Sequence, residues 1–147
     1  MNLNERLNED MKALMKSGDK FALGVVRMLR SAVKNAEIDA RKTLGDEEVL
    51  DILTREVKQR RDALQEFEKA GRDDLADQAK AELEVIQRYM PQPLTEEELA
   101  KIVEETISEV GAASKAEMGK VMSALMPKVK GRADGKQVNA AVQRLLV

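Results

Sequence analysis

Hydrophobic residues in the first half of the chain recur every three or four positions. The first segment places Leu7, Met11, Leu14 and Met15 on one face. This spacing is typical of an amphipathic helix with one buried face. The pattern continues through three more segments, so we expect helices at 4–16, 20–43, 47–71 and 74–89. Four such helices joined by short turns indicate a compact bundle or two helical hairpins.

Capping residues mark the starts of these segments. Asp19 and Asp46 each precede a hydrophobic repeat, and Asp is a preferred acceptor for the free amides at a helix N-terminus. We therefore expect Asp19 to cap the second helix and Asp46 to cap the third. In the second helix, Phe21 begins the inner face, which continues through Val25 and Leu29.

Two prolines interrupt the helical pattern in the middle of the chain. Pro91 and Pro93 lack amide hydrogens, and each disfavours helix in the residue before it. This break predicts an N-terminal domain at 1–90, a linker at 91–94 and a C-terminal domain at 95–147.

The C-terminal part carries three capping boxes, in which Ser, Thr or Asp is followed three residues later by Glu or Gln. The boxes are Thr95 with Glu98, Ser114 with Glu117, and Asp134 with Gln137. Each predicts the start of a short helix, and Pro127 and Gly131 limit the second one. No segment alternates cleanly between polar and apolar residues, so no sheet is expected. The predicted fold class is all-α, with an N-terminal four-helix region followed by a small three-helix C-terminal domain.

Composition removes several kinds of chemistry. The chain has no cysteine and no histidine, which excludes disulfides, thiolate metal sites and the commonest acid–base group at neutral pH. We find no catalytic constellation and expect no metal or other cofactor. The N-terminus lacks the apolar segment of a signal peptide, and no apolar run approaches the ~18 residues of a membrane span. We expect a soluble, cytoplasmic protein that does not bind membranes.

Charge is segregated in the C-terminal half, although the whole chain has a formal net charge of only −2. Residues 94–117 hold seven acids and two bases, whereas residues 118–147 hold six bases and one acid. Clustered lysines and arginines can contact successive phosphates of a nucleic acid. Because this segment has no aromatic residue for base stacking, double-helical RNA is favoured over single strands. The candidate RNA-binding residues are Lys120, Lys128, Lys130, Arg132, Lys136 and Arg144.

Plainer interpretations of the same segment stay open. The basic residues can form a solvated face, with some lysines paired to the acids at 94–117. The stretch GRADGK at 131–136 has too few residues between its glycines for a P-loop. Asp134 also competes with any anion at the following helix start, so a capped helix–turn–helix corner is favoured. Met118, Met122 and Met126 form a stripe that is better explained as core than as a groove for a partner.

Basic residues also gather in the third predicted helix, at Arg55, Lys58, Arg60 and Arg61. Glu56 lies four residues before Arg60, and such i, i+4 pairs support an exposed helix. We therefore expect these side chains to face solvent.

Two longer motifs carry a resemblance. The stretch MGKVMSALMPKVKGRADGKQVNAAVQRLL at 118–146 resembles the tail domain shared by YqeY proteins and the B subunit of tRNA-dependent amidotransferases. The stretch EFEKAGRDDLADQAKAELEVIQRYMPQPLTEEEL at 66–99 resembles the free-standing YqeY branch. The resemblance implies an all-helical protein whose tail contacts tRNA, through Lys120, Lys128, Lys130, Arg132 and Lys136.

Three functions follow as hypotheses. The first is a non-catalytic accessory protein that binds tRNA or a tRNA-handling enzyme. The second is a protein-interaction module that uses the acidic helix or the methionine stripe and does not bind RNA. The third, implied by the family resemblance, is a carbon–nitrogen ligase with glutamine as amido-nitrogen donor. We favour the first, because a chain of this length is not expected to hold an amidase or kinase domain.

Overall fold

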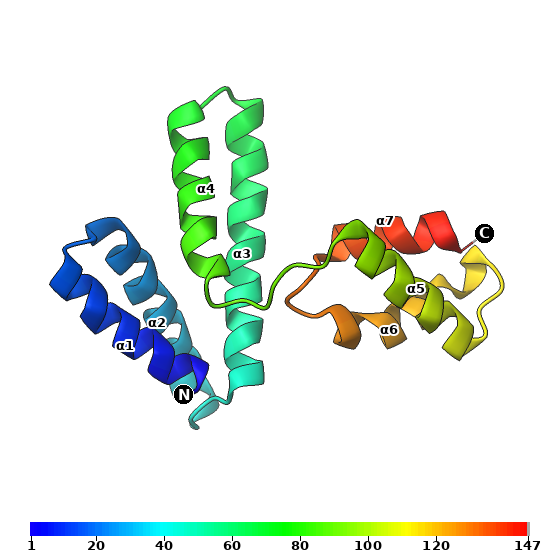
Figure 1. Cartoon of the computed structure of the whole chain (residues 1–147), viewed down its shortest axis with the longest axis horizontal. Helices are drawn as coiled ribbons and strands as arrows, with labels where there is room; N and C mark the ends of the chain where they lie inside the picture. The colour runs from blue at the N-terminus through cyan, green and yellow to red at the C-terminus, as the bar shows by residue number, and fades with distance from the viewer. Residues whose placement is uncertain (147) are drawn as a thin grey trace. The chain divides into compact units, whose positions relative to one another are not determined.

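The computed structural model describes residues 1–146, and this part of the chain is helical and contains no strand (Figure 1). The all-α prediction is therefore confirmed. Contacts divide the chain into two compact units, Met1–Met90 and Pro91–Val147. The first unit contains α1 (Leu3–Ser17), α2 (Lys20–Ala40), α3 (Asp46–Lys69) and α4 (Asp73–Gln87). The second contains α5 (Glu96–Val110), a 3-10 turn (Lys115–Glu117), α6 (Met118–Val129) and α7 (Gly135–Leu145).

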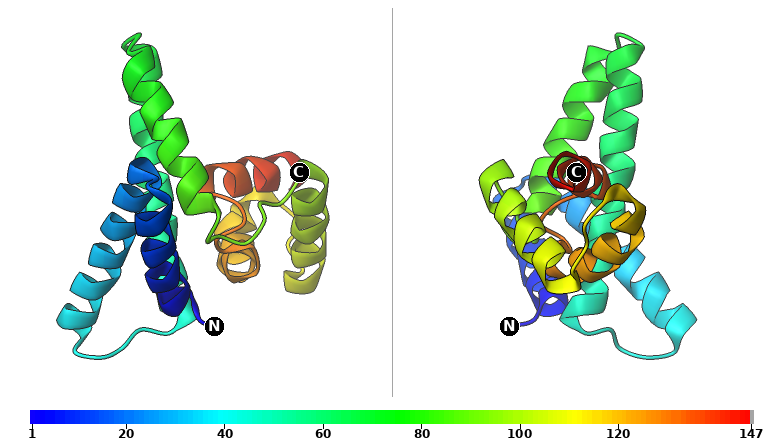
Figure 2. Two further views of the ribbon diagram at one scale, coloured as in Figure 1. Left: turned by 60° about the vertical axis from the view of Figure 1, so that its left-hand side comes forward. Right: turned by 90° about the vertical axis from the view of Figure 1, so that its right-hand side faces the viewer.

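The first unit is built from two helical hairpins. Helix α1 packs along α2, and α3 packs along α4, as Figures 1 and 2 both show. The hairpins meet through contacts of α2 with α4 and of α1 with α3. Side chains from all four helices form one core, which includes the fully buried Leu7, Leu29, Leu53 and Ile86. Burying each such side chain stabilises the unit by about 1.5–3 kcal/mol.

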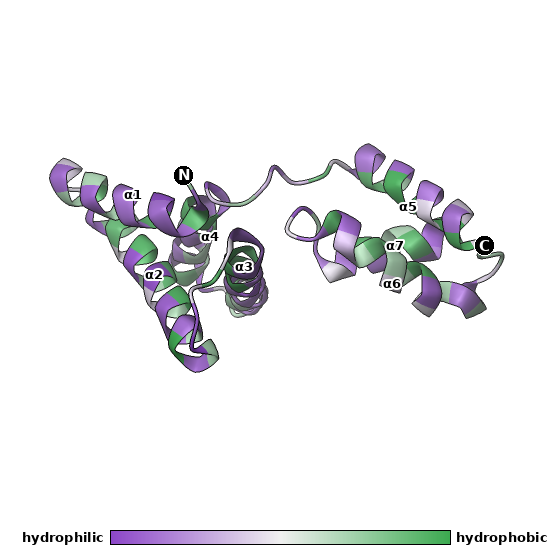
Figure 3. Cartoon of the chain, turned by 90° about the horizontal axis from the view of Figure 1, so that it is seen from below, coloured by the Kyte–Doolittle hydropathy of each residue, from purple (hydrophilic) through white to green (hydrophobic). Residues whose placement is uncertain are grey.

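Two residues predicted on the inner face are exposed. Met15, in the last turn of α1, keeps 54% of its surface, and Phe21, in the first turn of α2, keeps 44%. Figures 1 and 3 show that the turn joining α1 to α2 extends away from α3 and α4. Periodicity places both residues on the correct stripe, but neither α3 nor α4 of the same unit covers the stripe at this end.

One of the two predicted caps in this unit is correct. The Asp19 carboxylate accepts a hydrogen bond from the amide of Ala22 at 3.1 Å and caps α2. Asp46 was expected to cap α3, but Gly45 is the N-cap of that helix and Asp46 is its first residue. The Asp46 carboxylate instead accepts the Leu3 amide, one of the free donors at the start of α1, at 2.9 Å.

The end of α4 is fixed to α1 by a buried tyrosine. Tyr89 is 5% exposed, and its hydroxyl donates to the Asp10 carboxylate at 2.6 Å. The Arg6 guanidinium donates to the Arg88 carbonyl at 2.6 Å and lies 4.8 Å from the centre of the Tyr89 ring. Burial, aided by the hydrogen bond to Asp10, raises the pKa of Tyr89 well above its usual value.

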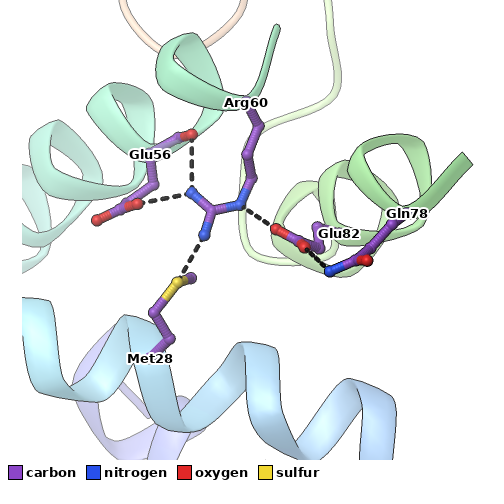
Figure 4. Close-up of polar contacts among 5 residues, drawn as sticks. All are labelled: Met28, Glu56, Arg60, Gln78 and Glu82. Atoms are coloured by element: carbon purple, nitrogen blue, oxygen red, sulfur yellow. Dashed lines mark hydrogen bonds and ion pairs between the residues drawn. The ribbon is translucent and has the colours of Figure 1, made fainter. Parts of the chain in front are cut away.

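Arg60 departs from the expected exposed position. Its side chain is 13% exposed and joins three helices (Figure 4). The guanidinium pairs with Glu56 of its own helix at 2.7 Å and with Glu82 of α4 at 2.8 Å, and it contacts the sulfur of Met28 on α2. The i, i+4 pair predicted from the sequence is present, but it lies in a mostly buried network between helices.

In the second unit, α5 packs against both α6 and α7, which also contact each other. Figure 3 shows hydrophobic and hydrophilic residues alternating along each of these helices. The core includes Val103, Val121, Leu125, Val138 and Val142, all at 0% exposure.

Two of the three predicted capping boxes are formed, those of Thr95 with Glu98 and of Asp134 with Gln137. Ser114 was expected to cap the middle helix, but its side chain makes no capping hydrogen bond. The Glu117 amide bonds the Ser114 carbonyl instead, closing the 3-10 turn that precedes α6. Pro127 lies inside α6, which continues to Val129.

The methionine stripe lies at the edge of this core. Met118 and Met122 are partly buried against it, while Met126 is 36% exposed. The central positions belong to Val121 and Leu125. The stripe therefore contributes to the core only in part.

Candidate nucleic-acid interface

The six candidate RNA-binding residues all lie on the hairpin formed by α6, the turn after it and α7. Lys128, Lys130, Arg132 and Lys136 surround the turn. Lys120 lies in the first turn of α6 and Arg144 in the last turn of α7. At 1.5 Å per residue, each is about 14 Å along its own helix from the turn. The structure thus brings four of the six together and separates the other two from them.

Lys128 is paired within the protein. Its ammonium lies 2.6 Å from the Glu109 carboxylate and donates to the Thr106 hydroxyl at 3.0 Å. Both partners are on α5, the acidic helix. The sequence had left open that lysines of the hairpin pair with the acidic residues at 94–117. Lys128 is paired in this way.

Arg132 holds the segment before α5 against the α6–α7 turn. Its Nε atom donates to the Gln92 carbonyl at 3.0 Å, and its own carbonyl accepts the Leu94 amide at 2.9 Å. Its guanidinium also lies 4.0 Å from the Glu98 carboxylate. The pKa of Glu98 is below its usual value, chiefly because the Thr95 amide and hydroxyl bond the carboxylate, with a smaller contribution from Arg132.

The start of α7 does not offer its amides to an anion. The Asp134 carboxylate accepts the Gln137 amide at 2.7 Å, and the Gln137 side chain accepts the Asp134 amide at 3.2 Å. A negative group already occupies the position where a phosphate would bind. The stretch at 131–136 is therefore a capped corner, as expected.

Charge on the hairpin is offset by its neighbour. Helix α5, which packs on α6 and α7, comes from the acidic segment 94–117, so net charges of −5 and +5 lie together. Lys130 and Lys136 also interact within the chain. Lys120 and Arg144 are exposed and make no hydrogen bond or ion pair among residues 1–146. Among the described residues, the hairpin thus offers two cations without a partner and four that already interact with other groups of the chain.

A second basic surface, on α2 in the first unit, was not identified from the sequence. Arg27, Arg30 and Lys34 lie on one face of this helix, with Ser31 and Asn35 beside them. The signal was present: residues 20–36 contain four bases and no acid. It was missed because hydrophobic periodicity alone explained the segment.

Two further features were sought among the described residues, a metal-binding group and a membrane-spanning helix. No group of three acidic side chains in 1–146 could hold a metal ion. No helix in that range is long and apolar enough to cross a membrane.

Comparison with known proteins identifies the family. The sequence profile of the family described as Yqey-like protein matches residues 4–146. This chain therefore belongs to the YqeY-like family, as its motifs indicated.

Named relatives come from fungi. Altered inheritance of mitochondria protein 41, mitochondrial, from Pyrenophora tritici-repentis is 29% identical over 96% of this chain and 79% of its own length. The protein of the same name from Candida glabrata is 42% identical over 57% of this chain, and that from Lachancea thermotolerans is 36% identical over 58%. These last two matches span 47% and 46% of the relatives' lengths.

The names of these relatives contradict the cytoplasmic location expected from the sequence, because they are mitochondrial proteins. The expectation rested on the lack of an apolar secretory segment. That criterion carries no information about mitochondria, whose targeting segments are amphipathic rather than apolar.

Proposed function

We propose that this YqeY-like protein is a non-catalytic accessory that binds tRNA, or another folded RNA, through the α6–α7 hairpin. The observation that carries the proposal is the charge of that hairpin, which holds six bases and one acid. Basic side chains on two adjacent helices can follow a phosphate backbone without reading bases. The resemblance of residues 118–146 to the tail of an amidotransferase subunit supports tRNA as the RNA.

The ion pairs on the hairpin do not prevent this use. The side chains of Lys128 and Glu109 are 36% and 60% exposed. Exposed pairs of this kind contribute about 0–1 kcal/mol, so a phosphate can displace Glu109 at little cost. Lys120 and Arg144 can bind a phosphate without breaking an ion pair to another of the described residues.

The test is binding of labelled tRNA to the whole chain at two salt concentrations, with duplex DNA of equal length as control. We expect tRNA to bind in preference to DNA and its affinity to fall steeply with salt. Absence of binding at low salt would contradict the proposal and direct attention to protein partners.

Two variants then locate the interface. Replacing Lys128, Lys130 and Arg132 with Ala removes three cations at the turn, and Lys120→Gln with Arg144→Gln removes the two that have no partner. Both should weaken tRNA binding. Lys101→Gln with Lys115→Gln removes the same charge as the second variant from outside the hairpin and should change little. Unchanged affinity in both hairpin variants would exclude this interface.

The non-catalytic part of the proposal has its own test. A carbon–nitrogen ligase that uses glutamine would release ammonia from it. We expect the purified chain to release none, with or without tRNA. Glutamine-dependent ammonia release would replace this proposal with the ligase alternative.

The two units support a division into a four-helix domain at 1–90 and a three-helix domain at 95–147. The segment at 91–94 is bound to the second domain through Gln92 and Leu94. Limited proteolysis should cut first near Met90. A first cut inside α3 or α5 would contradict this division.

A further inference from the structure

The basic face of α2 lies in the first unit and uses none of the residues of the proposed hairpin interface. Arg27, Arg30 and Lys34 line a groove of about 480 Å³, together with Ser31, Asn35 and Met11. The three cations span eight residues of one helix, or about 10 Å along its axis. They form a row beside the buried face of α2, with Arg27 and Lys34 exposed and Arg30 half-buried next to Met11.

This row of positive charge is not neutralised by the fold. Among residues 1–146, no acidic side chain pairs with Arg27, Arg30 or Lys34. Arg30 bonds only the sulfur of Met11, at 3.0 Å. The nearest acid along the helix is Glu37, whose carboxylate accepts the Leu44 amide at 2.9 Å. Lys128 and Arg60, by contrast, are each matched by a carboxylate.

The shape of the groove favours an extended ligand. All its lining residues except Met11 come from one helix, so its donors lie in a line along α2 rather than around a small phosphate compound. Arginine, lysine, serine and asparagine are the side chains that donate to the phosphates of nucleic acids. No aromatic side chain lines the groove, so it offers nothing for base stacking.

A membrane surface fits this face less well. A helix that lies on a bilayer inserts an apolar face beside its basic one. The apolar face of α2 is buried in the core of the unit, with Val26 and Leu29 at 0% exposure. Contact with lipid would therefore rest mainly on charge, since Phe21 and Ile38 are the large apolar side chains that α2 exposes.

We propose that the basic face of α2, formed by Arg27, Arg30 and Lys34, is a second nucleic-acid surface that contacts successive phosphates of a structured backbone. Ser31 and Asn35 supply uncharged donors between the cations. This surface goes beyond the hairpin interface, and it exists whether or not the hairpin binds RNA.

The test uses the whole chain, a labelled RNA hairpin and a DNA duplex of equal length. The variant is Arg27→Gln with Lys34→Gln, because both side chains are exposed, whereas Arg30 is half-buried against Met11 and stays unchanged. The matched control is Arg55→Gln with Lys58→Gln, which removes two exposed cations from α3. Circular dichroism of each variant checks that the helices remain.

Salt dependence gives the size of the effect. Each phosphate contact changes affinity about 3.5-fold between about 50 and about 200 mM salt. Two lost contacts should therefore make the affinity of the α2 variant about tenfold less sensitive to this change in salt. The α3 control should keep the sensitivity of the unchanged protein.

The outcomes separate this inference from the proposed function. Reduced salt sensitivity in the α2 variant supports the inference, even if the hairpin variants bind normally. An α2 variant that matches the unchanged protein overturns the inference, even if the hairpin variants lose binding. Absence of binding to both RNA and DNA at low salt overturns both. Binding only to vesicles that contain phosphatidylserine, lost in the α2 variant, would replace the nucleic acid with a membrane.

Discussion

The Lys128 ammonium at the end of α6 lies 2.6 Å from the Glu109 carboxylate of α5. The pair joins the basic hairpin to the acidic helix that packs on it. A phosphate that binds Lys128 would compete with Glu109 for the ammonium hydrogens. Under the proposed function, Glu109 would therefore act as an internal competitor for the RNA at this position.

Glu109→Gln should strengthen RNA binding. Removing the competing charge frees Lys128, and we expect tRNA affinity at low salt to rise by about threefold, with a steeper salt dependence. Glu104→Gln makes the same charge change on the other side of α5 and should have a smaller effect. Equal effects of the two changes would mean that only net charge matters and that Lys128 is not a contact.

Tyr89→Phe should destabilise the first unit. The change deletes the hydrogen bond from the buried Tyr89 hydroxyl to Asp10 and retains the ring over Arg6. Hydrogen bonds to charged groups are worth about 1.5–3 kcal/mol, and we expect a loss of unfolding free energy of about 1–2 kcal/mol because Asp10 stays partly solvated. Urea unfolding measures the change, and an unaltered midpoint would show that the bond contributes nothing.

Alkaline pH should weaken the fold through the same residue. The folded-state pKa of Tyr89 is raised, so its contribution to stability is complete below the unfolded pKa of about 10. Above that pH the unfolded chain loses the proton first, and unfolding free energy falls by about 1.4 kcal/mol per pH unit.

Tyr89 is the chain's only tyrosine, and there is no tryptophan, so tyrosinate absorbance reports this group alone. We expect the folded protein to titrate well above the unfolded protein in denaturant. The Tyr89→Phe variant should lose this part of the alkaline destabilisation. Coincident titration curves for the folded and unfolded protein would contradict the buried hydrogen bond.

Arg60→Met should be strongly destabilising. It leaves Glu56 and Glu82, with side chains 19% and 21% exposed, without their shared cation. Breaking a buried pair in this way costs about 3–5 kcal/mol, whereas replacing all its members with neutral groups costs far less. Adding Glu56→Gln and Glu82→Gln should therefore restore much of the lost stability. A triple variant no more stable than Arg60→Met alone would refute this account.

The two predicted serine and aspartate caps of the second unit should respond differently. Asp134→Ala removes a capping bond of 2.7 Å and should cost about 1 kcal/mol of unfolding free energy. Ser114→Ala removes a side chain that makes no capping bond and should cost less than about 0.5 kcal/mol. Thermal unfolding of both variants gives the comparison. Equal losses would mean that Ser114 caps the helix in solution.

Local signals in the sequence predicted local structure well. Asp19, Thr95 and Asp134 cap the helices they precede, because a capping bond needs only residues within three positions. Asp46 does not cap its own helix, because its carboxylate accepts a hydrogen bond from the Leu3 amide, 43 residues earlier in the chain. A contact between residues so far apart cannot be predicted from a short stretch of sequence.

Burial was harder to predict than the helical face. The pattern placed Phe21 on the inner stripe of α2, but it could not show that no other helix reaches that end of the hairpin. Arg60 shows the opposite case, since an i, i+4 pair typical of a surface is enclosed by α2 and α4. The basic row on α2 could have been recognised in the sequence as a segment without acidic residues. Only the structure shows that no acidic side chain among residues 1–146 pairs with it.

Arg132 holds the segment before α5, and under the proposed function it would also contact RNA. The same guanidinium that would meet a phosphate at the α6–α7 turn also holds the Gln92 carbonyl. A phosphate that draws the Nε–H of Arg132 away from Gln92 would release this tether, and ligand binding and the order of the segment at 91–94 would then be thermodynamically linked with opposite sign. Hydrogen exchange at the Leu94 amide, bonded to the Arg132 carbonyl, would then accelerate as the site fills. Binding of RNA to the C-terminal unit would then be detectable as increased mobility of residues 91–94, which lead into that unit.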